Sequence, residues 1–376
     1  MAYLVRRLLE NTSNESFLRK EYSESEPLDR LLAPPHISFT ARAEDNPPAP
    51  PDRFMNEPHT DFSKASARAA MTEAIGQVKS QLGRALSYPI FFGKTPSGGE
   101  LVSYNPSEPN EIVGRLRNCG PEDVPHAVHM AQLKRAEWAS RTPHERADFL
   151  AKAAAIMRRR RFELAAWEIF ETGKPWREAD ADVAEAIDFC EFYAREMRRL
   201  GRPRRLGHEP GEVNHLVFSP RGIAAVIAPW NFPLAIPSGM VSAALVSGNV
   251  VLFKPSERSS VMGLLLIEVL QEAGIPDGVI QILPGGPEVG QALVAHPDVH
   301  LIAFTGSKDV GLRIMAQAAH VQPGQQMVKR VIAEMGGKNA IVIDETADLD
   351  EAVTGVVASF TGYQGQKCSA CSRAIV

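Results

Sequence analysis

The sequence is poor in cysteine and in aromatic residues, and it has no long uninterrupted apolar run. Its four cysteines (Cys119, Cys190, Cys368 and Cys371) are too few and too scattered for a disulfide framework. The longest apolar stretch, Pro237 to Leu252, is broken by Ser, Gly and Asn, and the first residues, MAYLVRRLLENTSNESF, lack the apolar core of a secretory signal. We therefore expect free thiols, no membrane span and a cytoplasmic location.

A net charge of one sign is also lacking. The chain has 41 basic and 45 acidic side chains, a formal charge of −4, which does not produce the field of a nucleic-acid or membrane-surface binder. A basic cluster from Arg195 to Arg205 could bind nucleic acid, but it lacks interleaved aromatic residues and ends a helical stretch, where positive charge is favourable. With 44% hydrophobic residues the chain is typical of a globular protein, and we expect a small-molecule ligand.

Proline marks the first boundary along the chain. Residues 33–60 are rich in proline and have little apolar periodicity, which predicts a linker, so that residues 1–32 belong to a different domain. Apolar residues then recur at helical spacing over 61–86 and 121–200. These stretches predict long amphipathic helices.

Beyond Gly211 the pattern changes to short apolar runs that alternate with helical stretches. The runs are GIAAVIAP, NVVLFKP, VIQILPG and VHLIAFTG, followed by KRVIAEMGG and NAIVIDE. This alternation is typical of βαβ units and predicts an α/β fold with a parallel sheet. Ligands of such sheets bind at the carboxyl ends of the strands.

Five short motifs lie at or after those strand ends. They are PWNFP at 229–233, KPSE at 254–257, FTGSKDVG at 304–311, EMGGKN at 334–339 and GQKC at 365–368. In this order and spacing they resemble the aldehyde dehydrogenase superfamily, over roughly residues 61–376. The resemblance implies a Rossmann-type nucleotide-binding domain with N-terminal helices at 61–333, and a catalytic domain that begins at 334 and is incomplete at 376.

Cys368 is the expected nucleophile. A thiolate that attacks an aldehyde gives a thiohemiacetal, and cysteine is the side chain most ready for this near neutral pH. We expect Cys119 and Cys190 to be buried core thiols. Cys368 and Cys371 form a Cys-x-x-Cys, which could be a redox pair or half of a zinc site; because no second ligand pair follows, we expect packing for Cys371 and no metal.

Two further side chains complete the catalytic set that the resemblance implies. The amide of Asn231 would join the backbone N–H of Cys368 in an oxyanion hole, whereas an asparagine in a turn is the alternative. Glu334, placed just after the strand RVIA and before Gly336 and Gly337, would be the general base for thioester hydrolysis. A solvated glutamate is the alternative.

The cofactor that the resemblance implies is NAD. FTGSKDVG follows a strand and opens a helix, where free N–H groups and the helix dipole suit a pyrophosphate, although a simple helix cap would look the same. Lys254 and Glu257 would reach ribose hydroxyls, and the Glu257 carboxylate would repel the 2′-phosphate of NADP. The cofactor-binding residues implied by the family pattern are Pro229, Trp230, Lys254, Ser256, Glu257, Gly286, Gly290, Phe304, Thr305, Gly306 and Ser307.

The stretch GQKCSACSR resembles the branch of the family that oxidises L-glutamate γ-semialdehyde, the open form of 1-pyrroline-5-carboxylate, to L-glutamate in proline catabolism. Ser369 would then donate a hydrogen bond to the substrate carboxylate, or it would merely cap the local backbone. Two alternatives remain open: an aldehyde dehydrogenase for another short semialdehyde, and a non-catalytic nucleotide-binding piece.

The N-terminal stretch YLVRRLLENTSNESF is similar to the last segment of the proline dehydrogenase barrel in bifunctional proline-utilisation proteins. Arg6, Arg7 and Glu10 would there meet the proline substrate, while a surface helix with an i, i+3 charge pair is the alternative. The family pattern also continues past the nucleophile with segments that this sequence lacks. We therefore expect a fragment of a homo-oligomeric parent with a fused proline dehydrogenase domain.

Overall fold

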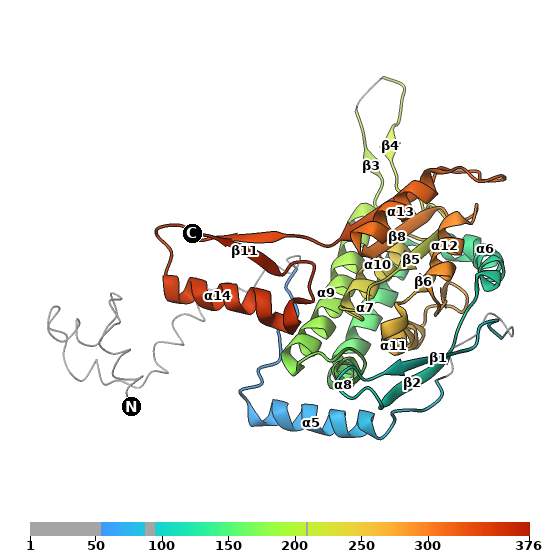
Figure 1. Cartoon of the computed structure of the whole chain (residues 1–376). Helices are drawn as coiled ribbons and strands as arrows, with labels where there is room; N and C mark the ends of the chain where they lie inside the picture. The colour runs from blue at the N-terminus through green and yellow to red at the C-terminus, as the bar shows by residue number, and fades with distance from the viewer. Residues whose placement is uncertain (1–53, 87–94, 208–209) are drawn as a thin grey trace, which may run out of the picture. The chain divides into compact units, whose positions relative to one another are not determined.

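The computed structural model describes residues 54–86, 95–207 and 210–376 (Figure 1). The chain divides into two units, Met1–Met55 and Asn56–Val376, and every helix and strand described below belongs to the second. Residues 1–32, with Arg6, Arg7 and Glu10, lie outside the described residues. Residues 56–60, at the end of the proline-rich stretch, hydrogen-bond to Asp180 and Asp188 of the long helix α9, Trp176–Leu200.

A five-stranded parallel sheet forms the centre of the fold, as the apolar runs predict. Its strands lie in the order β7-β6-β5-β8-β9. Their bounds are β5 Ile223–Ile227, β6 Val250–Lys254, β7 Ile280–Ile282, β8 Leu301–Gly306 and β9 Arg330–Met335. The first three strands are wholly buried, which explains why they read as continuous apolar runs rather than as alternating ones.

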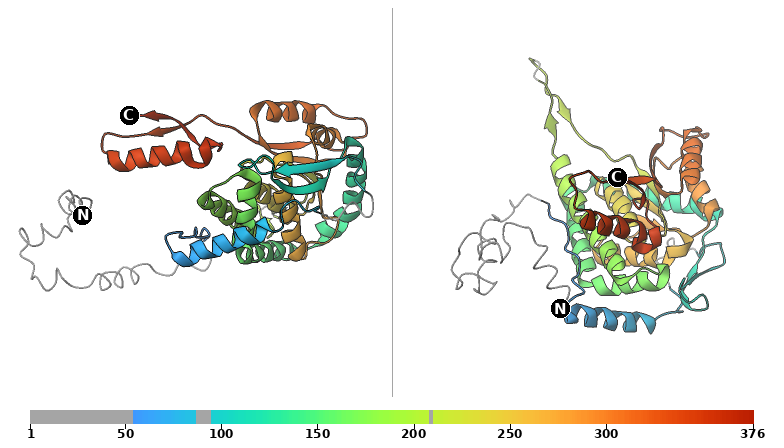
Figure 2. Two further views of the ribbon diagram at one scale, coloured as in Figure 1. Left: turned by 60° about the horizontal axis from the view of Figure 1, so that its bottom comes forward. Right: turned by 60° about the vertical axis from the view of Figure 1, so that its left-hand side comes forward.

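Helices cover both faces of this sheet (Figures 1 and 2). The crossover helices are α10 Ala235–Val246, α11 Ser260–Glu272, α12 Pro287–Ala295 and α13 Lys308–Ala319. Helices α10 and α11 both pack against α7, Pro143–Arg159, on one side, and α12 packs against α13 on the other. The chain therefore winds outward from β5 and then returns to its far side, as in doubly wound folds.

Five α-helices in the described part of the chain precede the sheet. They are α5 Ala65–Lys79, α6 Val124–Ser140, α7 Pro143–Arg159, α8 Arg161–Thr172 and α9 Trp176–Leu200. Helix α9 packs against α7, α8 and α10, while α6 contacts β5, β6 and β7. The indole of Trp138 is fully buried and donates to the carbonyl oxygen of Leu245 at 3.0 Å, which ties α6 to α10. No described helix is long and apolar enough to cross a membrane.

Two short antiparallel pairs flank these layers, β1 Glu100–Tyr104 with β2 Ile112–Arg117, and β3 Arg204–Arg205 with β4 His215–Leu216. After β9 the chain forms β10 Asn339–Val342, α14 Leu349–Thr361, the 3-10 helix η4 Gly362–Gly365 and β11 Cys371–Ile375. Strands β10 and β11 are parallel, and α14 packs against β11 (Figure 2). This βαβ unit carries Cys368 in the turn before β11.

Candidate active site

The carboxyl ends of β5 and β8 meet where the chain reverses its direction across the sheet. These two strands are neighbours but not consecutive, so the crevice beyond their ends is the place where doubly wound folds bind ligands. A cavity of about 560 Å³ opens there. The expected site residues that line it are Pro229, Trp230, Asn231, Ser256, Phe304, Thr305, Gly306, Ser307 and Cys368.

Cys368 is the exposed cysteine of the site. Cys119, Cys190 and Cys371 are buried, as expected, and burial raises the pKa of the Cys190 thiol to about 12. The side-chain amide of Asn339 on β10 donates to the carbonyl oxygen of Cys368 at 2.7 Å. The turn that carries Cys368 is therefore held by β10, while the thiol stays accessible.

Three residues just before Cys368 adopt left-handed backbone conformations. The φ angles are 50° at Tyr363, 53° at Gln364 and 71° at Gly365. Such angles are costly for residues with a side chain and need support from the surrounding structure. The hydroxyl of buried Tyr363 donates to the carbonyl oxygen of Thr172 at 2.8 Å, and the ammonium of Lys367 lies 2.6 Å from Oε2 of Glu178. Helices α8 and α9 thereby anchor residues 363–368, which we call the nucleophile loop after the role predicted for Cys368.

Asn231 reaches the nucleophile loop by a different bond from the one expected. Its Nδ2 donates to the carbonyl oxygen of Gln366 at 2.8 Å, two residues before Cys368. An amide carries two N–H donors, so this bond occupies one of them. The side chain therefore joins the turn after β5 to the nucleophile loop; its oxyanion role stays a prediction.

Glu334 does not lie after a strand, and that part of the sequence interpretation is wrong. It is inside β9, paired with Thr305 of β8, because β8 runs on to Gly306 and the ladder continues to Met335. Alternation along the strand turns Glu334 and Met335 to opposite faces. Met335 lines the Cys368 cavity, whereas Glu334 lines a neighbouring cavity of about 450 Å³ that shares Ile236 and Thr305 with it.

The residues expected to bind ribose gather at the end of β6. Lys254 is buried, and its Nζ donates to the carbonyl oxygen of Pro255 at 3.2 Å. Burial lowers the pKa of Lys254, although Glu257 and Glu288 act in the opposite direction. Gly290 of α12 lies beside its aliphatic stem, since a Cβ there would be 3.6 Å from Lys254 Cδ. Gly286 is the N-cap of α12.

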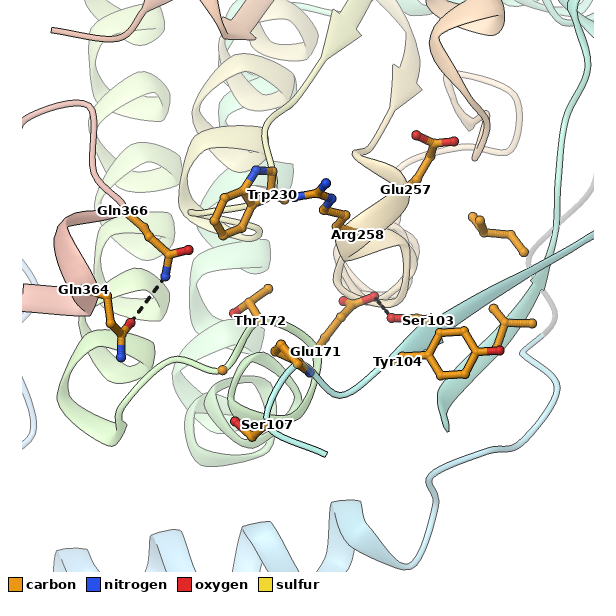
Figure 3. A pocket seen from close by; sticks show the side chains of 14 residues that line it. Ser103, Tyr104, Ser107, Glu171, Thr172, Trp230, Glu257, Arg258, Gln364 and Gln366 are labelled. Carbon is orange, nitrogen blue, oxygen red and sulfur yellow. Dashed lines mark hydrogen bonds between the residues drawn. The ribbon is translucent and has the colours of Figure 1, made fainter. Parts of the chain in front are cut away.

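A second cavity of about 630 Å³ borders the first through Trp230 and Gln366 (Figure 3). Glu257 and Glu171 also line it. Burial raises the pKa of Glu171 to about 7, against hydrogen bonds from the N–H groups of Met262 and Val261 and from the Ser103 hydroxyl. The sequence analysis did not single out Glu171. A glutamate directly after the apolar pair Ile169 and Phe170 was the available signal.

Ser369 is exposed and occupies the turn directly after Cys368. Its position beside the nucleophile agrees with a contact to substrate, but its role stays a prediction. Among residues 54–86, 95–207 and 210–376, no group of three or more His, Cys, Asp or Glu side chains could hold a metal ion.

Comparison with known proteins points to one family. The sequence profile of the aldehyde dehydrogenase family matches residues 94–376. The 1-pyrroline-5-carboxylate dehydrogenase of Geobacillus kaustophilus is 48% identical over 326 residues, which cover 86% of this chain and 63% of that protein. The chain thus spans less than two thirds of the length of this relative.

Solved structures that match this chain point to the same family. Proline utilization A from Bdellovibrio bacteriovorus, inactivated by N-propargylglycine, matches with a TM-score of 0.85 and 48% identity over 99% of this chain and 39% of that one. A 1-pyrroline-5-carboxylate dehydrogenase from Thermus with bound NAD matches with a TM-score of 0.83 and 46% identity, over 86% of this chain and 63% of that one. The resemblance read from the five motifs is confirmed, and the chain belongs to the aldehyde dehydrogenase family.

Proposed function

We propose that this chain carries the nucleotide-binding and nucleophile-bearing part of an NAD-dependent dehydrogenase that oxidises L-glutamate γ-semialdehyde to L-glutamate. The observation that carries the proposal is the single cavity at the switch point, which is lined by Cys368, by Asn231 and by the strand-end residues Phe304 to Ser307. The relatives named 1-pyrroline-5-carboxylate dehydrogenase support the choice of substrate.

The residues of this cavity and those at the end of β6 suit NAD. Ser307 is the N-cap of α13, so the first-turn N–H groups of that helix border the cavity, where a pyrophosphate is favoured. An ammonium has three N–H donors, and the Pro255 carbonyl engages one of those on Lys254, which leaves donors for ribose hydroxyls. Glu257, close to Lys254, disfavours a 2′-phosphate. NAD bound there would take up a hydride from the carbon that is attached to Cys368.

The chain's own side chains divide the remaining chemistry. The Cys368 thiolate attacks the aldehyde carbon, and a second N–H of Asn231 stabilises the charge that develops on the aldehyde oxygen. After oxidation, Glu334 takes a proton from the water that hydrolyses the Cys368 thioester. Glu334 lines the cavity next to that of Cys368, and Ile236 and Thr305 line both cavities, so this role requires Glu334 to reach the thioester across that shared lining. Ser369 binds the substrate carboxylate.

A second feature of the proposal concerns the whole protein. The match with proline utilization A covers 99% of this chain, which includes most of its N-terminal residues. This supports a parent in which a proline dehydrogenase domain precedes residue 33. Such a parent would produce the semialdehyde from proline and pass it to Cys368.

The test is NADH formation by the purified chain with NAD and 1-pyrroline-5-carboxylate, beside NAD binding followed by Trp fluorescence. Cys368→Ala should abolish NADH formation, whereas Cys371→Ala, which removes a buried thiol three residues away, should retain it. NAD binding without NADH formation would favour the nucleotide-binding alternative. Equal turnover of propanal and of the semialdehyde would contradict the assigned role of Ser369.

A further inference from the structure

A lysine that the proposed chemistry does not use is buried beneath the active site. Lys174 lies between α8 and α9, and its side chain is 0% exposed. Its ammonium forms an ion pair with Asp182 and lies 3.3 Å from Oε2 of Glu168, and both of these carboxylates are also fully buried. A charged group is retained in such a place only with close partners, so the position of this ammonium is tightly defined.

The ammonium of Lys174 also contacts two aromatic rings. It lies 4.4 Å from the ring centroid of Phe232 and 5.4 Å from that of Tyr363. Phe232 directly follows Asn231 in the turn after β5, and Tyr363 begins the nucleophile loop. Cation–π attraction is strongest when the cation has lost its water, as here. The buried ammonium of Lys174 therefore contacts both the ring beside Asn231 and the ring that begins the nucleophile loop.

Asp182 extends the network to the helix that follows Asn231. While Oδ2 pairs with Lys174, Oδ1 accepts the backbone N–H of Ala235, the first residue of α10, at 2.6 Å. A carboxylate at a helix N-terminus is favoured by the unpaired N–H groups there. The start of α10, and with it the turn that carries Asn231, is thus fixed to α9.

Burial acts on each ionisable group of the network. It raises the pKa of Glu168 well above its ordinary value, and the neighbouring Asp182 raises it further. Burial alone would lower the pKa of Lys174, but Asp182 and Glu168 raise it, with Asp182 the larger of the two. The ion pair between Lys174 and Asp182 is therefore the principal interaction of the network.

The nucleophile loop needs such a support. Tyr363 and Gln364 hold left-handed φ angles of 50° and 53°, which persist only when contacts outside the loop enforce them. Besides the ring contact with Lys174, Tyr363 donates to the carbonyl oxygen of Thr172, two residues before that lysine. Thr172 and Lys174, where α8 ends and α9 has not yet begun, therefore each contact Tyr363 of the nucleophile loop.

We propose that Lys174, held by Asp182, is a positioning residue that sets Asn231 against Cys368. It touches neither substrate nor cofactor in the proposed function, on which its kinetic consequence rests. Its contacts fix Phe232 and the start of α10 on one side and Tyr363 on the other. The direct bond between Asn231 and the Gln366 carbonyl then closes the gap between the two segments.

The first experiment compares Lys174→Met with Lys329→Met by amide hydrogen exchange of the purified chain. Lys329 is a matched control because it is also buried and its Nζ donates to two carbonyl oxygens, those of Val294 and His296, just before β9 begins. Residues 363–368 should exchange about tenfold faster or more in Lys174→Met than in Lys329→Met. Equal protection of this loop in both variants would overturn the proposal.

The second experiment is a double-mutant cycle on kcat with Asn231→Ala. In the otherwise unmutated chain, Asn231→Ala removes an oxyanion donor and should lower kcat about 100-fold or more. In the Lys174→Met background the same change should lower kcat by less than about tenfold, because the donor is already misplaced there. The KM for NAD should stay unchanged, since the Lys174 network does not include the end of β6. An equal loss of kcat in the two backgrounds would overturn the positioning role.

Two provisions keep the outcomes separate. If Lys174→Met does not fold, Tyr363→Leu removes the ring while leaving the ion pair, and it should give the same loss of coupling with Asn231→Ala and the same faster exchange over residues 364–368. If the unmutated chain forms no NADH from the semialdehyde, the proposed function fails. The exchange comparison then still decides whether Lys174 holds the nucleophile loop.

Discussion

Glu171 should make the stability of the chain depend on pH in a direction opposite to that of most carboxylates. It is buried at the end of α8, where it accepts a hydrogen bond from the Ser103 hydroxyl (Figure 3). Its carboxyl group also accepts the N–H groups of Val261 and Met262 at the start of α11. The effect of burial on the pKa of Glu171 outweighs that of the hydrogen bonds, so the pKa rises from 4.5 to about 7. Folding therefore favours the protonated form.

The magnitude follows from the difference between the two pKa values. One pKa unit corresponds to about 1.4 kcal/mol, so 4.5 in the unfolded chain against about 7 in the folded one amounts to about 3 kcal/mol. This contribution is fully present below pH 4.5 and is lost as the pH rises through 7. Glu171→Gln cannot ionise and should not show this loss.

The assay is the free energy of unfolding from urea titrations at pH values between 4.5 and 8. The free energy of unfolding of the unmutated chain minus that of Glu171→Gln should change by about 3 kcal/mol across that range, in favour of the variant at high pH. The lost acceptor oxygen in the variant adds an offset that does not vary with pH. Glu73→Gln, on the exposed face of α5, should give a constant difference. A constant difference for Glu171→Gln would refute the reasoning.

Three further predictions concern the loop, the sheet and the cofactor. Tyr363→Phe removes a buried hydrogen bond and should lower the free energy of unfolding by about 1 to 2 kcal/mol in urea titrations, and no change would contradict its anchoring role. Gly222→Ala should cost about 2 to 4 kcal/mol, because φ is 128° and the new Cβ would lie 2.7 Å from Nδ1 of His300. Gly99→Ala, with open space around it, should stay within about 0.5 kcal/mol, and equal losses for the two variants would contradict this steric account. Lys254→Met should weaken NAD binding about 10- to 100-fold in fluorescence titrations, and an unchanged Kd would remove Lys254 from the cofactor site.

The sheet was predictable because its strands are buried on both faces. Runs such as those of β5 and β6 contain little but apolar residues, and the motifs that follow β5 and β8 had to meet once these strands were neighbours in a parallel sheet. The grouping of Asn231, Thr305 and Cys368 around one cavity follows from this. The catalytic roles inside that cavity rest on the family resemblance.

The end of β9 was misplaced because its burial pattern differs from that of the other strands. Residues 330–335 alternate between exposed and half-buried, so apolar content fades before the ladder ends. Pairing with β8 extends the strand through Glu334 to Met335. A boundary set by the neighbouring strand is not visible in the local sequence.

The buried network was missed although a signal existed. Asp182 is followed at helical spacing by Ala186 and Cys190, which are buried, so it lies on the apolar face of α9. An acidic residue on such a face needs a partner, and Lys174 is eight residues away, before the helix begins. The sequence could not show that Phe232 and Tyr363 both contact the Lys174 ammonium in the folded chain.

The anchoring of the nucleophile loop also has a consequence for synthesis on the ribosome. The bonds from Tyr363 to Thr172 and from Lys367 to Glu178 join residues 191 and 189 positions apart. At about 5 to 20 residues per second, the corner between α8 and α9 is made about 10 to 40 s before its partners. Lys174 therefore spends that interval without the Tyr363 ring above it, and Cys368 is made only after the whole five-stranded sheet has been translated.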